Sequence, residues 1–75
     1  MTKEQTIRRI FHEHLGIEES RITREARMTD DLGCDSLDGI EMVIMIEDEF
    51  DIDIPDNAMN DFVTFGDVVR YVEGL

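Results

Sequence analysis

The stretch that decides the fold is DSLDGIEMVIMIEDEF, residues 35–50. Its apolar residues recur at helical rather than alternating intervals. Either Asp35 or Ser36 can cap a helix at its N-terminus. We therefore predict a helix that begins at one of these residues and runs to about Phe50.

At 100° per residue, the apolar residues of this helix fall into two stripes. The stripe that we expect to face the core consists of Met42, Val43, Ile46 and Phe50. The second stripe consists of Leu37, Ile40 and Ile44, on the same side of the axis as Ser36. Two interpretations of it stay open: a second buried face, or a partly exposed docking surface ringed by acids that select a basic partner.

Upstream of this helix, we predict another over residues 3–15 and a long loop over residues 16–35. Thr2 and Gln5 have the spacing of a capping box, and Gly16 is suited to a left-handed C-terminal cap. The loop has no sustained period, although it can include one short helical turn. We expect it to be pinned to the core by four apolar anchors, Ile17, Ile22, Met28 and Leu32.

Downstream, Pro55 ends any extension of the central helix. Asp56 can cap a short third helix near residues 57–61, and Thr64 can cap a last helix. The expected fold is therefore all-α: a four-helix bundle with a long loop between helices 1 and 2 and a short third helix. Residues 1–75 are expected to form one domain, and the protein to be a monomer.

Charge is distributed unevenly along the chain. The formal net charge is −12, and no Lys or Arg occurs between Met28 and Val69. Such a negative field repels nucleic acid and anionic lipid and steers basic partners inward, although a purely solubilising surface is an alternative explanation. The single cysteine, Cys34, excludes an intrachain disulfide, and no apolar run approaches the roughly 20 residues of a membrane span. We expect a cytoplasmic protein without stable membrane insertion.

Conventional catalytic and metal motifs are absent from the sequence. His12 and His14 face different directions on the first helix, so we interpret them as solvated or partly packed side chains. The surroundings of Ser36 lack the glycines of a nucleophile elbow and a nearby histidine that would act as base. There is no phosphate-binding glycine loop, zinc spacing or complete calcium loop. We therefore predict no catalytic residue and no metal ligand.

Ser36 remains as the candidate functional residue. A helix N-terminus favours an anion such as a phosphate ester on its oxygen, although a capping serine is more often purely structural. The wider string DLGCDSLD, residues 31–38, followed by Ile40, Glu41, Met42 and Val43, resembles the modification-site signature of acyl carrier proteins. Leu15-Gly16-Ile17, Ile54-Pro55-Asp56 and Thr64-Phe65-Gly66-Asp67 are also similar to segments of that family, so the resemblance covers essentially the whole chain.

The resemblance implies that a separate holo-acyl-carrier-protein synthase attaches 4′-phosphopantetheine from coenzyme A to Ser36. The protein would then be a carrier, not an enzyme, holding acyl groups as thioesters on the arm. Implied partners are ketosynthases, reductases, dehydratases and acyltransferases of fatty-acid or polyketide synthesis, which dock through basic patches. The implied docking positions are Asp35, Leu37, Asp38, Ile40, Glu41, Ile44, Glu47 and Asp48.

Three positions depart from the family pattern. Cys34 and Met45 stand where the family usually has a small residue, and Gly39 stands where it usually has Thr or Ser. Two alternatives to an acyl carrier stay open, a peptidyl or aminoacyl carrier and a non-carrier acidic helical interaction module. The D-S-L-D setting and the acidity favour the fatty-acid or polyketide side.

Overall fold

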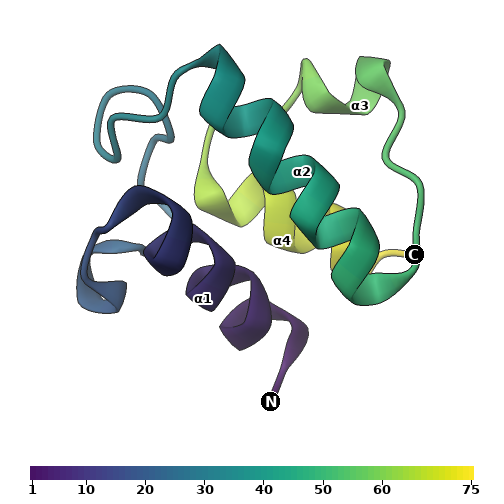
Figure 1. Cartoon of the computed structure of the whole chain (residues 1–75), viewed down its shortest axis with the longest axis horizontal. Helices are drawn as coiled ribbons and strands as arrows, with labels where there is room; N and C mark the ends of the chain where they lie inside the picture. The colour runs from purple at the N-terminus through teal and green to yellow at the C-terminus, as the bar shows by residue number, and fades with distance from the viewer.

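The computed structural model describes residues 1–75 and confirms an all-α fold with four helices. The elements are α1 (Lys3–Leu15), a 3₁₀ turn η1 (Glu19–Arg21), α2 (Ser36–Phe50), α3 (Asp56–Met59) and α4 (Phe65–Glu73). α1 packs against both α2 and α4, and the long loop and short third helix are as expected (Figure 1). No helix is both long enough and apolar enough to cross a lipid bilayer.

Reciprocal capping boxes define the starts of the three longer helices. They pair Thr2 with Gln5, Asp35 with Asp38, and Thr64 with Asp67. Asp35 is thus the cap of α2, which leaves Ser36 as the first helical residue.

The prediction that Asp56 caps the third helix is wrong. Pro55 occupies the N-cap position, Asp56 is the first helical residue, and no side chain caps this helix. The helix ends at Met59. The fixed φ of proline sets the chain direction at this start without a side-chain hydrogen bond.

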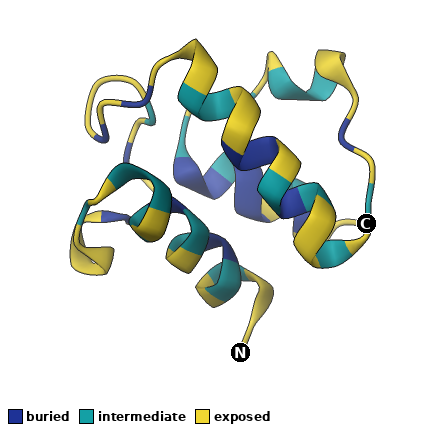
Figure 2. Ribbon diagram, viewed as in Figure 1, coloured by how far each residue is buried: buried dark blue, intermediate teal, exposed yellow.

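Fourteen buried apolar residues form the core, and they come from the inner faces of the helices and from the loops that cover them (Figure 2). Phe11 and Phe65 meet edge to face with 5.1 Å between ring centroids. Met42, Val43 and Ile46 are buried as expected, and Phe50 is half-buried. Met45, which belongs to neither predicted stripe, also packs partly against the core.

The loop between α1 and α2 is tied to the segment that precedes α4. The N–H of Met28 donates to the carbonyl of Val63, and the N–H of Phe65 to that of Ala26, each at 3.0 Å. The N–H of Gly66 donates to the carbonyl of Arg24, also at 3.0 Å. A Cβ at position 66 would lie 2.7 Å from that carbonyl oxygen, so the contact requires glycine.

The same loop is also held by its side chains. Ile22 and Leu32 are buried, and Ile17 and Met28 are half-buried, which confirms the four predicted anchors. Ala26 and Cys34 are also buried and add two more. Arg24 donates to Glu4 of α1 at 2.6 Å, and Arg8 donates to the other oxygen of Glu4 at 2.7 Å. These hydrogen bonds from Arg8 and Arg24 lower the pKa of Glu4 below its ordinary value. The loop is therefore a fixed part of the structure.

We predict that Asp67→Asn destabilises the protein at neutral pH. The N–H of Thr64, together with that of Val63 and the guanidinium of Arg70, donates to the Asp67 carboxylate and lowers its pKa below the ordinary 3.8. The expected loss is about 1 kcal/mol, which corresponds to a decrease of roughly 4–8 °C in Tm. Asp61→Asn is the matched control, because the exposed Asp61 carboxylate accepts no hydrogen bond.

The effect of Asp67→Asn should also depend on pH. Because the folded-state pKa is lower than the unfolded one, the stabilisation is complete above the unfolded value and is lost as pH falls through the folded value. Melting curves from pH 7 down to pH 2 should show the two proteins converging in acid. A Tm difference that stays constant over this range would contradict the role of the charge.

We predict that Gly39→Ala stabilises the protein. Gly39 lies inside α2, and a Cβ there would meet no atom within 4 Å. Removing an interior helical glycine should raise the free energy of unfolding by about 1 kcal/mol, measured by urea titration. Gly16→Ala provides the contrast, since Gly16 has φ 70° and an alanine there should destabilise. Equal effects of the two substitutions would contradict this account.

Candidate functional site

Ser36 stands at the exposed start of α2. The chain reaches it through Gly33, which has φ 68°, and through the buried Cys34. The backbone N–H groups of Ser36 and Leu37 have no acceptor within the protein, as is usual in the first turn of a helix. These donors and the positive end of the helix dipole favour an anionic group on the Ser36 oxygen. The surroundings therefore suit a phosphate ester.

The Ser36 hydroxyl makes no hydrogen bond to a histidine or a carboxylate. The nearby carboxylates of Asp35 and Asp38 are used instead in the capping box of α2. Without a base, a serine hydroxyl is a weak nucleophile. The geometry therefore fits a group that another protein modifies, rather than a catalytic serine.

The two histidines of α1 point to different places. Nδ1 of His12 lies 2.6 Å from the carbonyl oxygen of Ile17. Nε2 of His14 lies 3.2 Å from Asp38 Oδ1 and 3.6 Å from Glu41 Oε1. The expectation that they do not share a site is confirmed. The contact between His14 and α2 was missed, because it depends on how two helices pack and no spacing within α1 indicates it.

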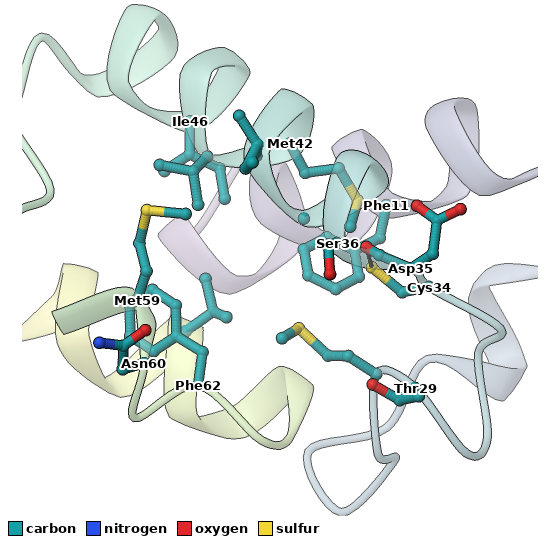
Figure 3. A pocket seen from close by; sticks show the side chains of 15 residues that line it. Phe11, Thr29, Cys34, Asp35, Ser36, Met42, Ile46, Met59, Asn60 and Phe62 are labelled. Atoms are coloured by element: carbon teal, nitrogen blue, oxygen red, sulfur yellow. Dashed lines mark hydrogen bonds between the residues drawn. The ribbon is translucent and has the colours of Figure 1, made fainter. Parts of the chain in front are cut away.

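A cleft of about 370 Å³ opens beside Ser36. Ten of its fifteen lining residues are apolar, and they come from all four helices and the long loop. Figure 3 shows Ser36 at one side of the opening, with Met59, Asn60 and Phe62 facing it across the cleft. The volume is within the range of small-molecule pockets. An apolar chain attached near Ser36 therefore has an apolar space within reach.

Cys34 contributes to the wall of this cleft and is buried. Burial, with the negative charges of Asp38 and Asp35, raises the pKa of its thiol above the ordinary value. The thiol is therefore held protonated near neutral pH and is a poor nucleophile. Cys34 is therefore a packing residue of the cleft wall.

The second apolar stripe of α2 is exposed. Leu37, Ile40 and Ile44 have 64%, 49% and 52% of their surface accessible. The interpretation of this stripe as a second buried face is therefore wrong. Three apolar side chains on one helix face, beside the Ser36 end, form an unpartnered surface.

The acidic side chains around this stripe differ in their exposure and in their hydrogen bonds. Asp35, Glu41 and Asp48 are exposed, whereas Asp38 and Glu47 are half-buried. Glu47 Oε2 accepts the N–H of Ile54 at 2.7 Å, so this carboxylate also fixes the chain that follows α2. The structure thus brings all eight predicted docking positions onto α2 and its cap. Three of them, Asp35, Asp38 and Glu47, also make hydrogen bonds that hold the local backbone.

Comparisons with known proteins agree with this geometry. The family model of the phosphopantetheine attachment site matches residues 5–72. The fold is similar to that of a candidate acyl carrier protein from Mycobacterium tuberculosis, with 33% sequence identity, 97% of each chain covered and a TM-score of 0.91. It is also similar to the acyl carrier protein from Enterococcus faecalis, with 32% identity, 99% of this chain and 98% of that chain covered, and a TM-score of 0.83.

The family match covers nearly the whole chain, and both solved structures share its helical architecture at more than 30% identity. This chain therefore belongs to the acyl carrier protein family and is a non-enzymatic carrier whose cofactor is covalently attached 4′-phosphopantetheine.

Proposed function

We propose that Ser36 is the attachment residue and that residues 1–75 act as one carrier domain for acyl intermediates of fatty-acid or polyketide synthesis. The observation that carries the proposal is the position of Ser36: an exposed hydroxyl at a helix N-terminus, on the rim of an apolar cleft. A non-carrier interaction module, the alternative function, would not need an exposed hydroxyl beside an apolar cleft.

The residues of the chain have limited tasks in this function. Ser36 supplies the accepting hydroxyl, and the free N–H groups of the first turn of α2 favour the phosphodiester that results. When bound, 4′-phosphopantetheine supplies the terminal thiol on which acyl groups are held as thioesters. The apolar lining of the cleft can bury the part of an acyl chain that reaches it, away from water. A separate holo-synthase performs the transfer from coenzyme A.

We propose the exposed face of α2 as the docking surface for that synthase and for ketosynthases, reductases, dehydratases and acyltransferases. Leu37, Ile40 and Ile44 provide the apolar contacts. The acids Asp35, Asp38, Glu41, Glu47 and Asp48 surround them, with no Lys or Arg between Met28 and Val69. Partners with basic patches are therefore attracted, because opposite charge accelerates encounter and suppresses wrong partners.

We predict that Ser36→Ala abolishes modification. Intact mass spectrometry after incubation with a holo-synthase, coenzyme A and Mg²⁺ should show one added phosphopantetheine on the wild type and none on the variant. Ser20→Ala is the matched control, because Ser20 is an exposed serine in η1, outside α2. Addition that persists in Ser36→Ala, or that disappears in Ser20→Ala, would contradict the assignment of the site.

We predict that Glu41→Lys with Asp48→Lys lowers the kcat/KM of this modification by about tenfold, because reversed charges slow the encounter with a basic partner. Raising the ionic strength should slow the wild type more than the variant, since salt screens the attraction. Glu18→Lys with Glu19→Lys is the matched control: it makes the same change of total charge on the long loop. An equal loss in both pairs would mean that only net charge matters, with no docking face on α2.

A further inference from the structure

One cluster of ligand-type side chains joins α1 to α2. His14 comes from the last turn of α1, and Asp38 and Glu41 come from the first two turns of α2. One ligand atom from each of these residues lies within 4.8 Å of the other two. His14 Nε2 lies 3.2 Å from Asp38 Oδ1 and 3.6 Å from Glu41 Oε1. The attachment of a cofactor at Ser36 does not require any of these contacts.

The spacing of these atoms fits a tetrahedral ion. Zinc binds nitrogen and oxygen ligands at about 2.0–2.2 Å, so two of its ligand atoms stand roughly 3.3–3.5 Å apart. The two distances from His14 Nε2, 3.2 and 3.6 Å, lie close to this range. The carboxylate oxygens of Asp38 and Glu41 lie within 4.8 Å of each other, so these two side chains would have to approach one another for all three residues to bind one ion. Glu41 is 51% exposed, which leaves room for water as a fourth ligand.

The charge of the cluster also favours a cation. Asp38 and Glu41 are three residues apart on one helix face, where like charges repel. Neither forms an ion pair with a Lys or Arg, and His14 is the partner of both. Asp38 Oδ2 stays in the capping box of α2 at 3.3 Å from the N–H of Asp35, so Oδ1 is available without loss of the cap.

We propose that His14, Asp38 and Glu41 form a binding site for a divalent ion of the zinc type. The imidazole decides the class of metal, because imidazole suits Zn²⁺ and Co²⁺, whereas Mg²⁺ and Ca²⁺ prefer oxygen ligands alone. Two carboxylates and one imidazole, with an open fourth position, form a site of the kind that such ions occupy. A bound ion would crosslink α1 to α2 beside the Ser36 end.

The test uses protein whose intact mass shows no attached arm, so that only side chains of this chain bind metal. Titration with Co²⁺ should produce the visible absorption bands of a low-symmetry, four-coordinate ion, and Zn²⁺ should remove them by competition. With Zn²⁺ at a hundredfold excess over its dissociation constant, Tm should exceed the value in EDTA by more than about 10 °C. Mg²⁺ and Ca²⁺ at the same concentration should raise Tm much less.

His14→Gln and Glu41→Gln should each remove the cobalt bands and most of the zinc-induced rise in Tm. His12→Gln and Asp48→Asn, matched changes of a histidine on α1 and an acid on α2, should retain both. Circular dichroism in EDTA establishes whether each variant is folded. If His14→Gln does not fold, Glu41→Gln provides the test instead. The proposed function plays no part in this measurement, so failure of either leaves the other intact.

Three results would overturn the site. Cobalt bands that survive in His14→Gln would show that the imidazole is not a ligand. Equal stabilisation by Mg²⁺, Ca²⁺ and Zn²⁺ would show unspecific binding to the acidic surface. A thiolate-to-cobalt charge-transfer band in the near ultraviolet would assign the metal to Cys34 instead.

Discussion

The backbone pairing between residues 26–28 and residues 63–65 is the constraint on which the rest of the structure depends. It fixes a loop of about twenty residues, which would otherwise have considerable conformational freedom. Its hydrogen bonds join the chain before α2 to the chain before α4. Gly66 allows the two backbones to approach, since no side chain is tolerated against the Arg24 carbonyl. The start of α2, and with it Ser36, is held in place by this contact.

The local parts of the fold were predictable from the sequence, and the parts that depend on packing were not. The caps at Thr2 and Thr64 involve residues three apart, so the sequence indicates these helix starts, whereas it left Asp35 and Ser36 both open as the cap of α2. Asp56 was mistaken for a cap because proline one residue earlier can begin a helix equally well. Met45 belongs to neither predicted stripe but packs against the core, because the contact surface of α2 is wider than one stripe.

The candidate site also has parts that the sequence predicts and parts that depend on packing. The helix-terminal position of Ser36 and the two-stripe pattern of α2 follow from period and capping, and the exposure of the second stripe agrees with one of the two interpretations. The cleft beside Ser36 and the contact of His14 with α2 involve residues more than twenty positions apart. Such contacts depend on how α1 crosses α2, which one sequence does not determine. The function of Ser36 as an attachment residue was inferred from the family resemblance rather than from its physical surroundings.

The short third helix gives the cleft two unequal walls. α2 buries three residues in the core, whereas α3 buries none and has no side-chain cap. Glu47 anchors the chain at Ile54, just before α3, and the pairing at Val63 anchors it again afterwards. Between these anchors, residues 55–62 contact the core only through partly buried side chains such as Met59 and Phe62, so we expect this segment to open at a lower free energy than the rest of the bundle. Hydrogen exchange would measure this difference as weak protection of α3 beside strong protection of α2. Opening of this wall would widen the cleft while the rest of the bundle stays folded.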